Sequence, residues 1–294
     1  MELKSFGKKT LIFIACIFVG ALASNAALLG IFMTQGLEIN STTNISDIFS
    51  NEDVNLTLVK IGVGFNHLIL FVGTAALFWW LIKENTFSKY FNIRPVKWEL
   101  LGLFILLLMS SYPLIGASGL LSEYVEFPEW LQGMDDEYAA SIEGLFSGEG
   151  VLNMLLNLVI IALLPAIGEE LIFRGIVQKE LHRVIANPHL VIFITSVIFS
   201  GIHLQAAGFL PKFLISYILC YSYYWGKSLI YPMILHFINN GSMTLALYFM
   251  DDELMDMDQA NTPEFPWVGV IISIILCVLL VRMIKAENGP EIAA

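Results

Sequence analysis

The sequence predicts an all-α fold, a polytopic helical bundle that is integral to a membrane. Of the 294 residues, 57% are hydrophobic and only 14% are charged, whereas soluble domains carry about 25% charged residues. The hydrophobic residues form long runs, and the segments between these runs hold most of the charge. Because about 20 apolar residues suffice for a helix to cross a bilayer, we expect about eight transmembrane helices.

The first expected span runs from Thr10 to Leu37 and follows three lysines. It contains Ala21-Leu-Ala23, which resembles the cleavage site of a signal peptide, but the apolar run continues to Met33. This continuation favours an uncleaved anchor helix over a cleaved leader. The other expected spans are residues 61–82, 101–121, 151–185, 189–204, 213–226, 228–250 and 265–281.

Local signals set several of these boundaries. The tryptophan pair at 79–80 is typical of a membrane interface at the end of the second span. Asn187 precedes Pro188, and the residue before a proline disfavours α geometry, so the fourth helix should end there. Lys212 and Lys227 bracket the sixth span, where their ammonium groups can reach the bilayer surface.

The segments between the spans alternate in charge. The acidic segments are 38–53, 122–150 and 251–264, and the second of these holds eight acidic residues and no lysine or arginine. The basic segments are the N-terminus, 83–97, 174–183, 227 and 282–285. Because basic loops stay in the cytoplasm, both termini are expected there and the acidic loops outside. Lys60 and Lys212, beside span ends, depart from this pattern.

Other features argue against several functions. The basic residues are few and scattered, so nucleic acid is not an expected partner. Cys16, Cys220 and Cys277 lie far apart in apolar runs, which argues against a disulfide or a thiolate metal site. His67, inside the second span, is interpreted as a packing or interfacial residue rather than a ligand.

A charged motif follows the apolar run 151–167 and reads Gly168-Glu-Glu-Leu-Ile-Phe-Arg-Gly175. Glu169 and Glu170 are adjacent, and Arg174 lies four residues beyond Glu170, on the same face of a helix. Ionisable groups in an apolar helix are costly and often functional, although an ordinary ion pair at a helix end would give the same pattern.

Two further polar motifs lie downstream in apolar runs. Phe199-x-x-x-His203 comes first, and His236-x-x-x-Asn240 then places an imidazole and an amide one turn apart. In this order the three motifs resemble those of the CPBP family, the CAAX and bacteriocin-processing intramembrane proteases, also called the Abi family. This family includes the type II CAAX prenyl endopeptidases. The resemblance covers about residues 151–250.

The resemblance divides the chain into three expected parts. Residues 1–150 would hold the first three transmembrane helices with acidic external loops. Residues 151–250 would form the catalytic core, which contains helices four to seven. Residues 251–294 would hold an acidic loop and the last transmembrane helix.

The spacing of the motifs places their side chains at a common depth. Glu170 and His203 are each roughly 22–26 Å from the Asn187-Pro188 turn if both flanking helices rise about 1.5 Å per residue. An antiparallel pair would hold them level, and His236 lies roughly 13 Å from the cytoplasmic end of its helix. We therefore expect a polar site partway into the membrane. The side chain of Glu169 or Glu170 should lie within about 8 Å of His203, with His236 near both, which allows for one bridging water or metal.

These side chains suit hydrolysis of a peptide bond by water. A carboxylate beside a histidine can activate water, and a histidine with an amide can stabilise an oxyanion. The resemblance implies that Glu169 and His203 activate the water, that His236 and Asn240 form the oxyanion site, and that Glu170 and Arg174 support them.

The sequence leaves the use of a metal open. The family is often described as metalloproteases, and Glu169, His203 and His236 together could ligate Zn²⁺. The chain contains no His-Glu-x-x-His pattern, which slightly favours a metal-independent mechanism with the glutamate as base.

Other protein classes fit the motifs less well. Gly116-Ala-Ser-Gly119 matches a rhomboid-type serine motif, but the His-x-x-x-Asn motif follows it instead of preceding it, so we interpret it as a small-residue packing patch. The alternatives are a transporter with an intramembrane Glu/His relay, although no repeated halves are visible, and a non-catalytic bacteriocin-immunity or scaffold protein. The expected partners are the lipid bilayer and a peptide or membrane-protein substrate. The expected location is a bacterial cell membrane.

Overall fold

The computed structural model describes residues 2–36, 48, 54–148, 150–249 and 265–288. Every regular element within these ranges is a helix, which confirms the predicted all-α class. The acidic segment 251–264 and nearly all of the segment 38–53 lie outside the described residues.

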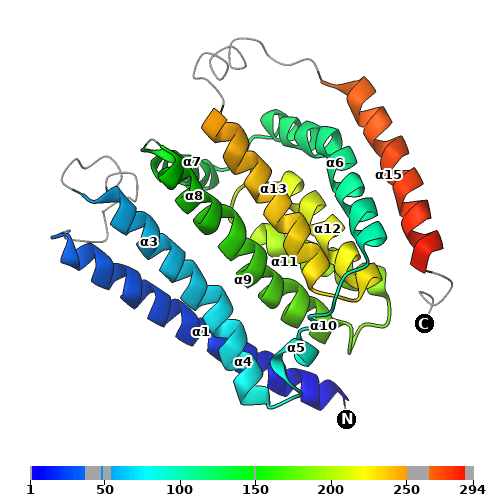
Figure 1. Cartoon of the computed structure of the whole chain (residues 1–294), viewed down its shortest axis with the longest axis horizontal. Helices are drawn as coiled ribbons and strands as arrows, with labels where there is room; N and C mark the ends of the chain where they lie inside the picture. The colour runs from blue at the N-terminus through cyan, green and yellow to red at the C-terminus, as the bar shows by residue number, and fades with distance from the viewer. Residues whose placement is uncertain (1, 37–47, 49–53, 149, 250–264, 289–294) are drawn as a thin grey trace.

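The N-terminal helices form a pair along one side of the molecule (Figure 1). The first is α1 (Glu2–Thr34), and the second is a continuous helix made of α3 (Leu56–His67), η1 (Leu68–Gly73) and α4 (Thr74–Ile82). The segment η1 is a π-helical turn that begins directly after His67. The short helix α5 (Phe87–Tyr90) then leads to α6 (Trp98–Leu120).

The central helix extends from Val151 to Leu181 and changes type along its length. Its segments are α8 (Val151–Asn157), η3 (Leu158–Leu163), α9 (Leu164–Ile172), η4 (Phe173–Gln178) and α10 (Lys179–Leu181). Both η3 and η4 are π-helical turns, which widen a helix locally and often occur at functional sites.

Four further helices complete the bundle. They are α11 (Pro188–Gly201), α12 (Phe209–Gly226), α13 (Ile230–Phe249) and α15 (Trp267–Asn288). The helix α13 packs against η3 and α9, while α11 and α12 both contact η4. On the opposite side from α1, α15 packs against α6 (Figure 1). The central helix is therefore enclosed by α3 with η1, α11, α12 and α13.

All eight predicted spans contain a helix in the structure, and five helices in the described ranges are long and apolar enough to cross a membrane. These five are Ser5–Thr34, Leu56–Ile82, Trp98–Leu120, Val151–Leu181 and Trp267–Glu287. The helix α11 is apolar but shorter, and α12 and α13 are less apolar. The chain is thus a membrane protein, while the count of eight spans and the cytoplasmic position of the termini remain predictions.

Two expectations about local structure were wrong. The acidic segment 122–150 is not a loop throughout, because it contains η2 (Leu121–Tyr124) and α7 (Glu129–Phe146). Apolar residues recur in α7 at helical spacing, at Leu131, Met134 and Ile142, and the density of charge obscured this pattern. The fifth helix ends at Gly201 instead of Leu204, so His203 lies in the following loop.

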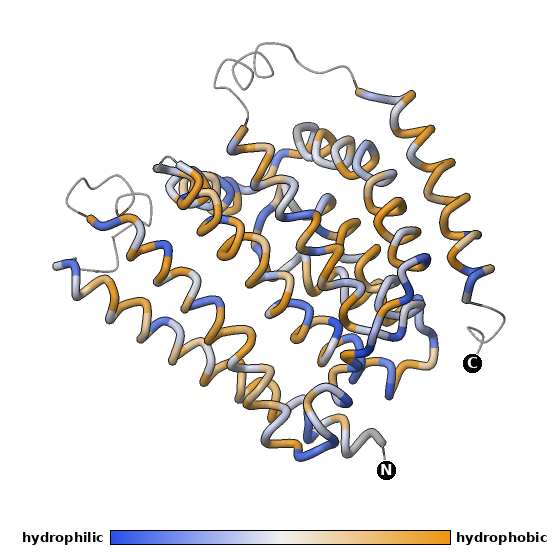
Figure 2. Tube along the Cα trace, in the orientation of Figure 1, coloured by the Kyte–Doolittle hydropathy of each residue, from blue (hydrophilic) through white to orange (hydrophobic). Residues whose placement is uncertain are grey.

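Two large apolar cores lie on either side of the central helix, and a third, smaller cluster joins α1 and α3. One joins α1, α4, α5 and the α9–η4 segment, through buried residues such as Phe78, Tyr90 and Leu171. The other joins α6, α12, α13 and α15, through residues such as Phe104 and Leu219. Apolar residues also dominate the outer helices, and hydrophilic residues gather near α5 and α10 (Figure 2). This pattern suits a bundle whose outer helices face lipid.

Candidate functional site

The central helix buries the charged motif where α9 meets the π-helical turn η4. Glu169 and Glu170 lie in α9, directly after Gly168, and Arg174 lies in η4. Glu170 and Arg174 are fully buried, and Glu169 is 9% exposed. A Cβ atom on Gly168 would lie only 2.7 Å from the Cβ atom of Phe71 in η1, so glycine allows the close approach of these two helices.

The predicted i,i+4 pair of Glu170 and Arg174 is present. The Arg174 Nη1 atom donates to Glu170 Oε1 at 2.8 Å. Arg174 Nη2 donates to the backbone carbonyl of Ser216 in α12 at 3.1 Å and to the Ser216 hydroxyl at 2.9 Å. Further hydrogen bonds make a buried ion pair less costly, and Ser216 satisfies the Nη2 group of Arg174. Arg174 thereby connects Glu170 on the central helix to α12. Glu170 Oε2 and Arg174 Nε are buried without a hydrogen-bond partner among the described residues.

His236 connects α13 to both glutamates. Its Nδ1 atom lies 2.7 Å from Glu170 Oε1, and its Nε2 atom lies 3.9 Å from Glu169 Oε2. Because the Glu170 carboxylate oxygen accepts a hydrogen bond from Nδ1 of His236, this nitrogen carries the proton. The same bond fixes the orientation of the ring. The Nε2 atom is thus directed at Glu169. We refer to Glu169, Glu170, Arg174 and His236 as the polar cluster.

Phe199 lies at the centre of the side chains around this cluster. Its ring centroid is 4.8 Å from the Arg174 guanidinium, 6.1 Å from the His236 ring and 5.0 Å from the His203 ring. The sequence motif Phe-x-x-x-His included Phe199 but gave it no role. Its contacts indicate that it spaces the two histidines and covers the guanidinium.

His203 borders the polar cluster without a direct hydrogen bond to it. Its Nδ1 atom lies 2.7 Å from the Phe199 carbonyl, which can only accept, so Nδ1 is the donor and Nε2 is left as an acceptor. The ring lies within electrostatic range of His236. The structure therefore places the rings of His203 and His236 around Phe199, whereas the close Glu–His contacts are those of His236.

Asn240 lies one turn beyond His236 on α13. Its Nδ2 atom donates to the Ile161 carbonyl in η3 at 3.0 Å, and its Oδ1 atom accepts a hydrogen bond from Asn239 Nδ2 at 3.0 Å. An amide nitrogen carries two hydrogens, so one N–H group is still available beyond the bond to Ile161. The π-helical turn supplies the carbonyl that orients this amide.

His67 is a neighbour of the site that the sequence did not assign to it. A Cβ atom on Gly168 would lie 3.2 Å from His67 Nε2, which is buried without a hydrogen-bond partner among the described residues. The ring stacks on Phe71, with centroids 4.3 Å apart. His67 therefore packs against the residue before Glu169, in agreement with its interpretation as a packing residue. A histidine in an apolar run was the available signal, and nothing in the sequence linked it to α9.

The side chains of the site do not form a metal-binding set. Within the described residues, no three His, Cys, Asp or Glu side chains converge closely enough to hold a metal ion. Glu169, His203 and His236 are thus not close enough together in this structure to hold Zn²⁺, and we derive no step through a metal.

A comparison with family models identifies the segment that carries these residues. Residues 151–242 match the family described as type II CAAX prenyl endopeptidase Rce1-like. The match supports a CAAX protease family assignment. It covers less than half of the chain, and it includes all six residues that the motifs singled out. No curated protein and no solved structure matches the chain.

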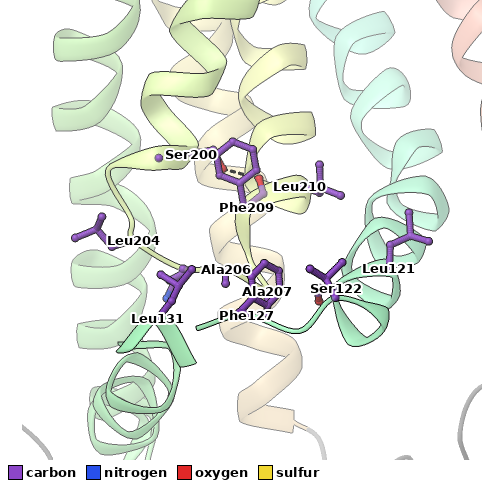
Figure 3. Close-up of a pocket in the computed structure, with 13 residues that line it drawn as sticks. Leu121, Ser122, Phe127, Leu131, Ser200, Leu204, Ala206, Ala207, Phe209 and Leu210 are labelled. Atoms are coloured by element: carbon purple, nitrogen blue, oxygen red, sulfur yellow. Dashed lines mark hydrogen bonds between the residues drawn. The ribbon is translucent and has the colours of Figure 1, made fainter. Parts of the chain in front are cut away.

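The family-matched segment also borders an apolar cavity of about 440 Å³. The residues labelled in Figure 3 come from two segments that line this cavity. One is the segment 121–131, from the end of α6 into the start of α7, and the other is the segment 200–210, which includes the loop after α11. Gly201 and Leu204 flank the His203 position in this lining. The cavity is therefore an apolar space beside the loop that holds His203.

Proposed function

We propose that this chain is an intramembrane endopeptidase that hydrolyses a peptide bond of a peptide or membrane-protein substrate by water activated at Glu169. The observation that carries this proposal is the His236 imidazole, which Glu170 fixes at 2.7 Å so that its other nitrogen faces Glu169 at 3.9 Å. The family match to residues 151–242 supports a protease of the CAAX type in general.

In the proposed mechanism Glu169 is the general base. It removes a proton from a water molecule, and the water oxygen attacks the carbonyl carbon of the substrate. His203 accepts a hydrogen bond from the same water through Nε2, because its Nδ1 proton is directed at the Phe199 carbonyl. The C–N bond then breaks, and the proton held by Glu169 passes to the leaving amine.

The tetrahedral intermediate carries a negative oxygen that needs hydrogen-bond donors. His236, as an imidazolium that carries protons on both Nδ1 and Nε2, and the free N–H group of Asn240 would supply them from adjacent turns of α13. Arg174 would act through Glu170, by holding the carboxylate that orients His236. Glu170 and Arg174 are thus supporting residues in this proposal.

The site lies nearer to the basic end of the central helix than to its acidic end. Glu169 is roughly 18 Å from Leu181 and roughly 27 Å from Val151, at about 1.5 Å rise per residue. Because basic loops face the cytoplasm, this asymmetry supports cleavage near the cytoplasmic face of the membrane. The donor set described above supports a metal-independent mechanism with glutamate as the base.

Substitution of the water-activating residues tests the proposal. Membranes that contain the wild-type chain are compared with membranes that contain Glu169→Ala, His203→Ala or the double variant, and the new protein N-termini are identified by mass spectrometry. We expect each single variant to abolish the same cleavages and the double variant to be no worse, because both residues act on one water. Exposed His189 provides the control His189→Ala, which should cleave normally. Wild-type cleavage by the double variant would refute the proposal.

A further inference from the structure

The helix α7 contacts the loop that carries His203, although it lies outside the family-matched segment. Asp135 Oδ2 accepts a hydrogen bond from the Ala207 backbone N–H group at 3.2 Å. One turn further along α7, the Tyr138 ring lies 5.5 Å from the Lys212 ammonium at the start of α12. The helix thus contacts the segment between α11 and α12 by polar groups from two successive turns.

These contacts account for the position of Lys212, which departed from the charge pattern of the loops. Lys212 lies within electrostatic range of Asp135 and of His203. A cation at the acidic end of the bundle is therefore matched by a carboxylate and an aromatic face from α7. The same residue connects α7 to the neighbourhood of His203.

Tyr138 extends this connection toward the polar cluster. Its phenol interacts electrostatically with the side chain of Gln205, which is 6% exposed. Partial burial raises the pKa of Tyr138, the contact with Gln205 lowers it, and the charge of Glu169 raises it further. Tyr138 therefore lies within electrostatic range of Glu169.

The loop itself needs external support. Leu204, directly after His203, has a φ of +52°, a left-handed conformation that residues with a Cβ atom rarely adopt. On one side of the loop lies the apolar cavity of about 440 Å³, so close packing does not hold it there (Figure 3). The restraint that α7 provides for this loop therefore comes mainly from its polar contacts with Ala207 and Lys212.

We propose that α7 is a clamp that positions His203 for hydrolysis, with Asp135 and Tyr138 as its positioning residues. This inference rests on the proposed function, in which His203 binds the reacting water. It assigns a role in the reaction to the acidic segment, which neither the motifs nor the family match includes. The clamp holds the 202–208 loop in its strained conformation. It thereby keeps the His203 imidazole beside Phe199 and near His236.

Variants of Asp135 test the clamp against matched controls on the same helix. Asp135→Ala removes the acceptor for the Ala207 N–H group, whereas Asp135→Asn retains an oxygen that can accept it. Asp136→Ala and Glu137→Ala remove exposed carboxylates from neighbouring positions of α7. In cleavage assays with purified full-length protein, we expect kcat to fall about 10- to 100-fold in Asp135→Ala with KM little changed, and to recover in Asp135→Asn.

A measurement without turnover separates the clamp from the proposed function. Hydrogen–deuterium exchange at the Ala207 amide should be faster in Asp135→Ala than in the wild type, Asp135→Asn and both controls. Equal exchange and equal kcat in Asp135→Ala and Asp136→Ala would overturn the clamp. If exchange responds as expected but wild-type protein cleaves no peptide, the proposed function fails, and the role of α7 in positioning His203 for hydrolysis fails with it.

Discussion

Two clusters of charged side chains lie along the central helix, and they differ in their access to water. The polar cluster, near the middle of the helix, has Glu170 and Arg174 fully buried. The second, which we name the end cluster, consists of Lys9, Glu84, Glu180 and Arg183 and lies near α5 and α10. In the end cluster the side chains of Glu84 and Arg183 are 35% and 37% exposed.

The chemistry of the two clusters is similar, since each has a carboxylate shared by two basic groups. Glu170 Oε1 accepts from Arg174 and His236, and Glu180 is paired with Lys9 at 3.5 Å and with Arg183 at 3.4 Å. The end cluster joins α1 and the 83–86 turn to the central helix, which is a structural role. In the polar cluster, the Nε2 atom of His236 faces Glu169 at 3.9 Å, which is too far for a direct hydrogen bond. Both groups are therefore available to a substrate or a water molecule. The comparison teaches that burial, together with uncommitted reactive atoms, distinguishes a candidate active site from a structural ion pair.

The largest difference between the clusters should appear when one arginine is removed from each. Arg174→Ala leaves Glu170 buried without its guanidinium, so we expect a loss of about 3–5 kcal/mol in stability. Arg183→Ala removes a partly exposed pair and should cost about 0–1 kcal/mol. Thermal unfolding of both variants in the same detergent measures the contrast. Similar losses for the two variants would show that the polar cluster is not sealed from water.

A loss of rate should further distinguish the neighbourhood of the polar cluster from the end cluster. Asn240→Ala removes one proposed oxyanion donor, and such a loss costs about 10²–10³ in kcat. The adjacent variant Asn239→Ala removes an amide that contacts only the Asn240 side chain among the described hydrogen bonds, so it should retain most of the rate. Comparison of kcat for the two variants tests the assignment, which would be wrong if Asn240→Ala retained full activity.

The smallest effect concerns pH and the end cluster. Burial raises the pKa of Glu84, but the hydrogen bond and charge of Lys9, helped by Arg183, outweigh burial and hold this pKa below its ordinary value of 4.5. A depressed folded pKa stabilises the fold above the unfolded pKa, and this stabilisation is lost as pH falls through the folded pKa.

Lys9→Ala should therefore flatten the decline in stability below about pH 4.5, and high salt should weaken the same contribution. Unfolding temperatures between pH 6 and pH 3 measure it. A variant whose pH dependence matched that of the wild type would show that Lys9 does not hold Glu84 charged. Arg174 and Glu170, which are fully buried, should respond little to salt.

The sequence predicted those parts of the fold and site that depend on local periodicity. Apolar runs of sufficient length located the helices, and i,i+4 spacing predicted the Glu170–Arg174 pair because both residues lie on one helix. The order of the three motifs also anticipated that α9 and α13 meet, since His236 contacts both glutamates. In each case the signal is the spacing of residue types along one or two helices.

The parts that were missed depend on contacts between distant segments. No local sequence pattern predicts the π-helical turns η3 and η4. These turns pack against helices that are distant in the sequence, namely α13 and α11. The sharing of one Glu170 oxygen by Arg174 and His236 requires three helices at once. The helix α7 was not predicted because the segment 122–150, with its eight acidic residues, resembled a solvated loop. The contact between Asp135 of α7 and Ala207 joins residues that are 72 positions apart in the sequence. The position of His203 in a loop follows from the early end of α11 at Gly201.

The most direct test of the central claim is peptide cleavage by the purified chain in lipid nanodiscs. A library of peptides from membrane proteins is supplied in water enriched in ¹⁸O, and products are identified by mass spectrometry. Hydrolysis at Glu169 predicts new C-terminal carboxylates that carry ¹⁸O with the wild-type chain, with or without a chelator, and none with Glu169→Gln. Equal cleavage by Glu169→Gln, or no cleavage by the wild-type chain, would contradict the claim. Loss of cleavage with a chelator and its recovery with Zn²⁺ would contradict the metal-independent mechanism.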